Sequence, residues 1–100
     1  MALDYRQRIE TLNPRINAFV DLTKEPHGEE LAWAAKSNIA VSGLPLTAGC
    51  EAYRARIAET DAETVQRIRA SGGTLLGTVN MHEGALGATT DNEAYGRTFV

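Results

Sequence analysis

The sequence predicts an α/β fold in which helices cover a mixed, mostly parallel β-sheet. An apolar run from Leu31 to Ala35 resumes at Ile39 to Val41, as in a buried strand. Further along the chain, a helical pattern ends at Gly72-Gly73 and the apolar run 74–79, TLLGTV, follows at once. The order helix, glycine, strand is typical of an α/β unit packed on a mostly parallel sheet.

The composition is that of an ordinary globular domain. The 100 residues suit one small domain or a piece of a larger one, and 43% hydrophobic with 23% charged residues excludes a disordered chain. The net charge of −3, without a basic cluster, argues against a nucleic-acid surface. No run is long enough to span a membrane, and charged residues occupy the place where a signal peptide needs an apolar core. The single cysteine fits a reducing compartment, so we expect a cytoplasmic protein.

The first part of the chain predicts a helix, a strand and a loop. Apolar residues recur at helical spacing from Tyr5 to Leu12, and Asn13-Pro14 is expected to end that helix. Apolar and other residues then alternate over 16–22, the period of a half-buried strand. Residues 24–30 are polar and contain proline and glycine, which indicates a loop.

The middle of the chain predicts a turn and the best helix. Residues 42–45, SGLP, indicate a turn, while 51–59 fit either a helical turn or an irregular connection. Residues 60–63, TDAE, have a capping-box pattern, and Val65 belongs to the apolar stripe of the helix that follows. Ser71-Gly72-Gly73 is expected to end it.

Lys36 is the unusual residue of the first apolar region. Lysine is rarely buried without a partner, and a desolvated ammonium has a lowered pKa, which lets the neutral amine accept a proton. Alternatively, Lys36 marks the end of a strand and points into water, as unpaired charges on strands usually do. The residues alone leave both readings open.

Two blocks of the sequence resemble the amidase signature family, which contains amide hydrolases and the amidase subunit of tRNA-dependent amidotransferases. The stretch 31–50 is similar to the family segment L-P-x-A-V-K-D-N-I-x-V-x-G-L-P-T-T-A-G-S, and 80–96, NMHEGALGATTDNEAYG, is similar to N-M-D-E-F-A-M-G-S-S-T-E-N-S-A-F-G. The matching positions of the first block are Leu31, Ala34, Lys36, Asn38, Ile39, Val41, Gly43, Leu44, Pro45, Thr47, Ala48 and Gly49.

The resemblance implies an amide hydrolase that works through an acyl-enzyme. Lys36 would be the general base of a Ser-Ser-Lys triad, and Gly84, Ala85 and Leu86 would flank the acyl-binding pocket as substrate-binding residues. In the family, both serines come from a Gly/Ser-rich stretch that begins shortly beyond the place of Val100. Residues 1–100 would therefore be the N-terminal part of a single amidase domain of amidase signature fold, inactive in isolation.

The resemblance also implies the partners and leaves alternatives. The partners would be a small-molecule amide substrate and either a second copy in a homodimer or amidotransferase subunits; no direct nucleic-acid contact, membrane, cofactor or metal is implied. The chain could instead be the glutamine amidase subunit of a tRNA-dependent amidotransferase, or a non-catalytic amidase-like binding protein. Three departures bear on this choice: Ser37 replaces the usual acid, the connection over 24–30 is short, and Gly84 and Leu86 replace a phenylalanine and a methionine.

Other chemistry finds little support in the sequence. His82-Glu83 and His27 do not have metal-ligand spacing, so a zinc site is not predicted. Cys50 is expected to be a small packing residue. The small residues 84–87 would, without the resemblance, indicate a short helix packed tightly on the sheet. The polar side chains that we expect to bond backbone in turns are Asn80, Thr90 and Asn92.

Overall fold

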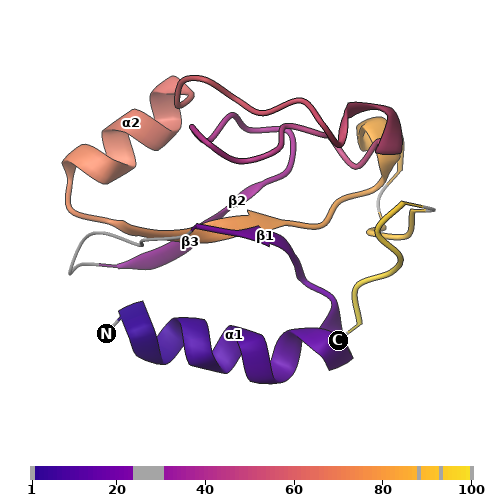
Figure 1. Cartoon of the computed structure of the whole chain (residues 1–100), viewed down its shortest axis with the longest axis horizontal. Coiled ribbons are helices and arrows are strands. Elements are labelled where there is room, and N and C mark those ends of the chain that lie inside the picture. Colours follow the sequence, from indigo (N-terminus) through magenta and orange to yellow (C-terminus); the bar gives the residue numbers. More distant parts are fainter. Residues whose placement is uncertain (1, 24–30, 88, 93, 100) are drawn as a thin grey trace.

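The computed structural model describes residues 2–23, 31–87, 89–92 and 94–99. A three-stranded sheet lies in the middle, with one helix below it and another helix and several loops above it (Figure 1). The elements, in chain order, are α1 (Ala2–Ile16), β1 (Phe19–Leu22), β2 (Ala32–Lys36), the 3₁₀ turn η1 (Glu51–Tyr53), α2 (Glu63–Ala70), β3 (Thr74–Val79) and the 3₁₀ turn η2 (Glu83–Ala85).

The sheet is mixed, as predicted. Its strand order is β1-β3-β2, with β1 antiparallel and β2 parallel to β3. The parallel register pairs Ala32 with Thr74 at one end and Lys36 with Val79 at the other. The central strand β3 has the bounds expected for the apolar run 74–79, and four of its six residues are buried. The carboxyl ends of β2 and β3 therefore lie side by side.

The core fills the space between the sheet and α2. Ala35 of β2, Leu75 of β3 and Val65 of α2 are at most 2% exposed and pack together with Val41. Val65 is the residue of the predicted apolar stripe that is fully buried, which fixes α2 on this face of the sheet. The partly buried side chains around this cluster are Trp33, Ile39, Leu44 and Ala62.

The first helix runs past the expected stop. It continues through Pro14 to Ile16, although a proline there has no N–H to donate to the carbonyl of residue 10 and its ring crowds that carbonyl. Asn17 then takes the left-handed conformation, with φ of 56°, and its N–H donates to the carbonyl of Asn13 at 2.6 Å. The side chain of Asn13 accepts from the N–H groups of Ala18 and Phe19, both at 2.8 Å. This cap occupies the start of the expected strand 16–22, so β1 begins only at Phe19.

The capping box expected at 60–63 does not form. The N-cap of α2 is Ala62, which has no side chain able to cap the helix. The carboxylate of Asp61 is used elsewhere: Oδ1 accepts from the Ser42 N–H at 2.7 Å, and Oδ2 lies 2.9 Å from Nε of Arg69. The turn over 42–45 forms as predicted, with φ of 85° at Gly43. Residues 51–59 combine both readings, because η1 is followed by an irregular connection, and the loop predicted at 24–30 lies outside the described residues.

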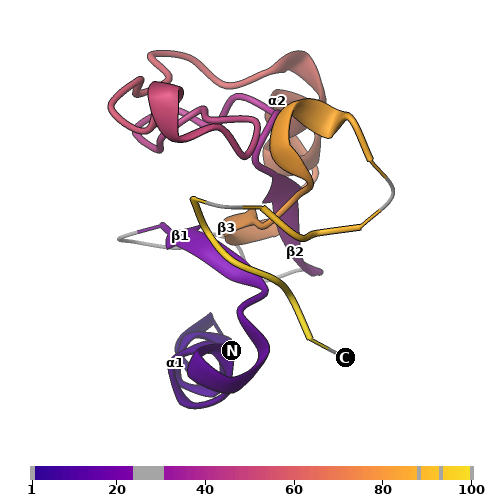
Figure 2. The ribbon, with the colours of Figure 1, turned by 90° about the vertical axis from the view of Figure 1, so that its right-hand side faces the viewer.

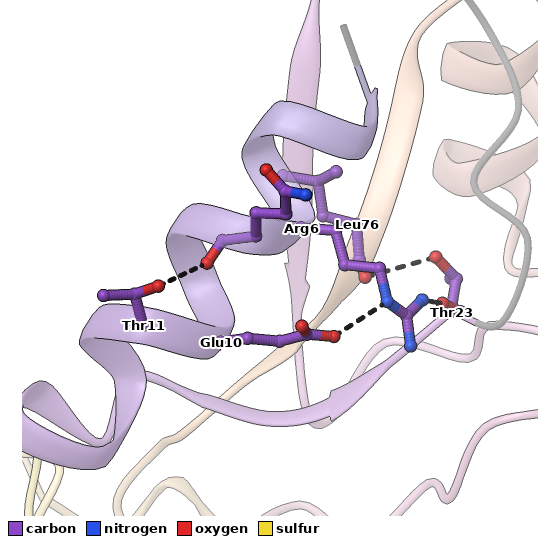
Figure 3. Close-up of polar contacts among 6 residues, drawn as sticks. Arg6, Glu10, Thr11, Thr23 and Leu76 are labelled. Carbon is purple, nitrogen blue, oxygen red and sulfur yellow. Dashed lines mark hydrogen bonds and ion pairs between the residues drawn. The ribbon is translucent and has the colours of Figure 1, made fainter.

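Hydrogen bonds join α1, in the lower layer, to its neighbours. Arg6 of α1 forms an ion pair with Glu10 at 3.2 Å and donates to the carbonyl of Thr23, just after β1 (Figure 3). The Thr23 hydroxyl in turn donates to the carbonyl of Leu75 at 3.0 Å. At the other end of the sheet, the last described residues run beside the α1–β1 junction, where the Phe99 N–H donates to the carbonyl of Ile16 at 2.8 Å (Figure 2).

Candidate functional site

The two sequence blocks that resemble the amidase family meet at one edge of the sheet. Lys36 is the last residue of β2, and its partner in the parallel ladder is Val79, the last residue of β3. The second block begins with the next residue, Asn80. In open sheets, ligands bind outside the carboxyl ends of parallel strands, which is where these residues lie.

The side chain of Lys36 is exposed. The prediction of a buried, desolvated amine is therefore wrong for the described part of the chain, and the alternative, a lysine at a strand end that faces water, is confirmed. No described carboxylate lies within 4.0 Å of this amine, so no ion pair holds it. The backbone of Lys36, in contrast, is fixed by the ladder and by its carbonyl, which accepts from the N–H of Ile39 at 2.9 Å.

Ser37, the next residue, is buried and joins the two strand ends. It is 2% exposed, and its hydroxyl donates to the carbonyl of Val79 at 2.5 Å. Its own carbonyl accepts from the N–H of Ala48 at 3.1 Å. An uncharged residue at this position thus does what an acid could not, since a carboxylate has no proton to donate to a carbonyl.

The segment 47–50 lies between the two blocks. The carbonyl of Ala48 accepts from the Gly84 N–H at 2.8 Å, so two hydrogen bonds lead from Ser37 through Ala48 to the second block. Gly49, with φ of 75°, approaches the second block so closely that a Cβ there would lie 3.0 Å from the carbonyl oxygen of Met81. Cys50 is half-buried, with its sulfur 3.7 Å from the carbonyl oxygen of Ala48, which fits the packing role expected for it.

Asparagine side chains shape the second block. The Nδ2 group of Asn80 lies 3.1 Å from the carbonyl oxygens of Thr90 and Gly96, and its Oδ1 accepts from Asn92 at 2.9 Å. Asn92 also bonds the carbonyl of Met81 at 2.7 Å. Both asparagines are buried. Their predicted role, bonding backbone in turns, is confirmed, as it is for Thr90, whose hydroxyl accepts from the N–H of residue 98.

The predicted substrate-binding residues are accessible at this edge. Gly84, Ala85 and Leu86 are all exposed, Leu86 to 89%. Gly84 and Ala85 have positive φ, 60° and 61°, within the single 3₁₀ turn η2. The alternative, a short helix packed tightly on the sheet, is therefore wrong. The structure brings these residues to the Lys36 edge through the bond between Gly84 and Ala48, and their role in substrate binding stays a prediction.

A polar hollow in the second block was not foreseen. It has a volume of about 370 Å³ and is lined by His82, Glu83, Asp91 and Asn92. Nδ1 of His82 lies 3.1 Å from the hydroxyl of Thr89. The signal was present in the sequence, since these polar residues flank the small residues 84–87 that turn the chain back. No group of three or more metal-binding side chains occurs in the parts of the chain that the structure describes.

Another cavity is unrelated to either block. It is apolar, about 270 Å³ in volume, and lies between α1 and the sheet, with Ile9, Leu12 and Leu76 in its wall. None of its lining residues comes from 31–50 or 80–96. No helix in the described part of the chain is long and apolar enough to cross a membrane.

One carboxyl group of the sheet has a shifted pKa. Burial raises the pKa of Asp21 in β1 above its usual value, and the positive charge of Arg54 opposes this rise. The Arg54 guanidinium stands 5.0 Å from the ring centre of Tyr95 and donates to the carbonyl of Ala94 at 3.2 Å. Arg54 thereby links the segment after η1 to the end of the second block.

Known proteins match this chain over most of its length. The family model for amidases matches residues 31–99. The glutamyl-tRNA(Gln) amidotransferase of Nitratiruptor sp. has a subunit that is 40% identical over 83 residues, which cover 83% of this chain and 18% of the relative. An acylamidase of Rhodococcus erythropolis is 34% identical over 111 residues, covering 92% of this chain and 23% of the relative. The chain thus spans only about a fifth of the length of these curated relatives.

The fold agrees with this match. The crystal structure of a glutamyl-tRNA(Gln) amidotransferase subunit from Thermotoga maritima superposes with a TM-score of 0.89 at 23% identity, over 97% of this chain and 23% of that chain. The mixed sheet with its helices is accordingly part of the amidase signature fold. With both blocks inside the matched range, the chain belongs to the amidase signature family.

Proposed function

We propose that residues 1–100 form the N-terminal part of a longer, cytoplasmic amidase domain that hydrolyses an amide C–N bond through an acyl-enzyme, with Lys36 as the general base. The observation that carries this proposal is the position of Lys36. It is the last residue of a parallel strand, at the edge where both family blocks meet. Its exposed side chain leaves the amine within reach of groups outside this chain.

The proposed chemistry needs an activated nucleophile, a proton for the leaving amine and donors for the oxyanion. The neutral amine of Lys36 takes a proton from a bridging serine, and this serine takes the proton of a second serine, whose oxygen attacks the amide carbon. The C–N bond breaks as the proton passes to the leaving nitrogen, and water then hydrolyses the acyl ester. Both serines would come from a Gly/Ser-rich segment beyond Val100.

In this proposal, the rest of the domain must also shield the Lys36 amine from water. An ammonium in contact with water stays charged at neutral pH, so a base must be shielded from solvent to act. The exposed edge around Lys36 is where the remaining segments would cover the amine. The turn at Gly84, Ala85 and Leu86 would form one wall of the acyl pocket, since it is joined to the same edge through Ala48.

A second candidate is an amidase subunit of a tRNA-dependent amidotransferase. It is favoured by the relative from Nitratiruptor, which is a subunit of a glutamyl-tRNA(Gln) amidotransferase. Such a protein would release ammonia from glutamine and pass it to a partner subunit, whereas a free amidase would release it to water. Both candidates use the same residues of this chain.

The test is an assay of the complete protein on simple amides and on glutamine, with ammonia release as the measurement. Hydroxylamine should intercept the acyl-enzyme as a hydroxamate, and the isolated 1–100 chain should be inactive, since it lacks the proposed nucleophile. Turnover by residues 1–100 alone would refute the proposed division of the site. Glutamine turnover that rises when copurified subunits are present would select the amidotransferase, while turnover independent of any partner would select the free amidase.

A further inference from the structure

We propose that Ser37 is a positioning residue for Lys36, because its hydroxyl fixes the carboxyl end of β2 to the carboxyl end of β3. The inference rests on the proposed function of Lys36 and adds to it. A base must be held close to one geometry to transfer a proton efficiently, and a displacement of about 1 Å can cost a hundredfold in rate. The question is therefore what holds Lys36 in place.

The side chain of Lys36 is not fixed by an ion pair with any described residue. It is exposed, and none of the described carboxylates lies within ion-pair distance of its amine. The position of Lys36 therefore depends on its backbone, which pairs with Val79 in the ladder and accepts a hydrogen bond from the N–H of Ile39. Lys36 is the last residue of the strand, so the backbone beyond it must be held by other means.

Ser37 fixes the backbone just beyond Lys36. Its hydroxyl donates to the carbonyl of Val79, the residue that faces Lys36 across the ladder. Its carbonyl accepts from Ala48, whose own carbonyl accepts from Gly84. One buried residue thus ties the end of β2 to the end of β3 and to the segment that leads to the second block. Without the hydroxyl, one of the bonds that hold the end of β2 to the end of β3 is lost.

The site requires a small side chain that donates a hydrogen bond. Ser37 is 2% exposed, which leaves no room for a long polar side chain, and its partner is a carbonyl oxygen, which only accepts. Alanine fits the space but cannot donate. Threonine keeps the donor with one added methyl group, and cysteine keeps a weak donor of similar shape.

The chain also offers a matched control. The hydroxyl of Thr23 donates to the carbonyl oxygens of Leu75 and Leu76 at 3.0 and 3.2 Å, so it too joins a neighbouring segment to β3. It does so near the opposite end of β3, away from Lys36. Thr23→Val removes this hydroxyl with little change in shape. It should lower stability as Ser37→Ala does, without moving the base.

The experiment measures kcat and KM for a simple amide, together with urea unfolding, for the complete protein carrying Ser37→Ala, Ser37→Thr or Thr23→Val. We expect Ser37→Ala to lower kcat by about tenfold to a hundredfold with KM within about twofold, since a misplaced base affects the chemical step. Ser37→Thr should restore kcat to within about threefold of the parent. Thr23→Val should keep kcat within about twofold at a comparable loss of stability.

The inference is overturned if kcat of Ser37→Ala stays within about twofold of the parent, if Thr23→Val loses as much kcat, or if threonine rescues nothing. Should Ser37→Ala fail to fold, Ser37→Cys takes its place: its thiol is a much weaker donor than a hydroxyl, so kcat should still fall by about threefold or more, and a kcat within about twofold of the parent overturns the inference. A parent protein that hydrolyses no amide would refute the proposed function instead, so the two failures are distinguishable.

Discussion

Replacing one atom at the centre of the second block should destabilise the protein strongly. Asn80 is 5% exposed, and its Nδ2 group lies 3.1 Å from the carbonyl oxygens of Thr90 and Gly96 and 3.2 Å from the hydroxyl oxygen of Thr98. Asn80→Asp keeps the shape of the side chain and replaces this nitrogen with an oxygen. The variant then sets a buried acceptor against two carbonyl oxygens, so both hydrogen bonds become repulsive contacts.

The magnitude follows from the groups that lose their partners. An amide nitrogen carries two hydrogens, so two of the three contacts count as full hydrogen bonds, each contributing about 0.5–1.5 kcal/mol. The carbonyls of Thr90 and Gly96 lose their donor at a part-buried site, which adds about 1–3 kcal/mol in total. We therefore expect the free energy of unfolding to fall by about 2–6 kcal/mol. A domain of this size has about 5–15 kcal/mol in total.

The assay is equilibrium unfolding in urea, with Asn38→Asp as the matched control. Asn38 is exposed, so the same atomic change should alter the free energy of unfolding by no more than about 0.5 kcal/mol. A loss for Asn80→Asp within about 1 kcal/mol of that control would show that the buried network around Asn80 does not hold the second block.

Two further predictions concern β1. A Cβ at Gly77 would collide with the carbonyl oxygen of Asp21 in β1, so Gly77→Ala should cost about 3 kcal/mol or more in urea unfolding. Gly43→Ala, with nothing within 4 Å of the new Cβ but φ of 85°, should cost about 1–2 kcal/mol. Equal losses would contradict the close approach of β1 and β3. Burial raises the pKa of Asp21, so the folded state binds the proton of this carboxyl group more tightly than the unfolded state does. The resulting contribution to stability is present below the unfolded-state pKa and is lost as pH rises through the folded-state pKa. Asp21→Asn should therefore gain stability relative to the parent as pH rises from about 3 to about 7, and a constant difference over that range would contradict the shift.

The sequence predicted β3 well, whereas β1 begins at Phe19 instead of residue 16 and β2 ends at Lys36, before the second apolar run at 39–41. The run 74–79 is apolar and bounded by glycine and asparagine, and β3 has those bounds. The expected helix stop at Asn13-Pro14 was wrong: the helix continues to Ile16, and Asn17 ends it in the left-handed conformation. The capping box over 60–63 was wrong for another reason: its carboxylate bonds Ser42, 19 residues away, which local pattern cannot show.

The candidate site was predictable in outline. Two blocks of family-like sequence at the ends of neighbouring parallel strands must meet, and Lys36 faces Val79 as that arrangement requires. The exposure of Lys36 was not predictable, because it depends on what covers the edge and not on the strand itself. The bond from Ser37 to Val79 spans 42 residues, so the sequence showed only an unusual serine and not its partner.

The central claim is that Lys36 acts as the base in amide hydrolysis, and kcat/KM of the complete protein carrying Lys36→Ala tests it most directly. The bonds that hold Lys36 at the strand end are made by its backbone and not by its side chain, so urea unfolding should change by no more than about 1 kcal/mol. Arg67→Ala, which removes an exposed cation of α2, serves as the control. We predict a loss in kcat/KM of at least about a hundredfold for Lys36→Ala and none for the control; activity of Lys36→Ala within about tenfold of the parent would contradict the assignment.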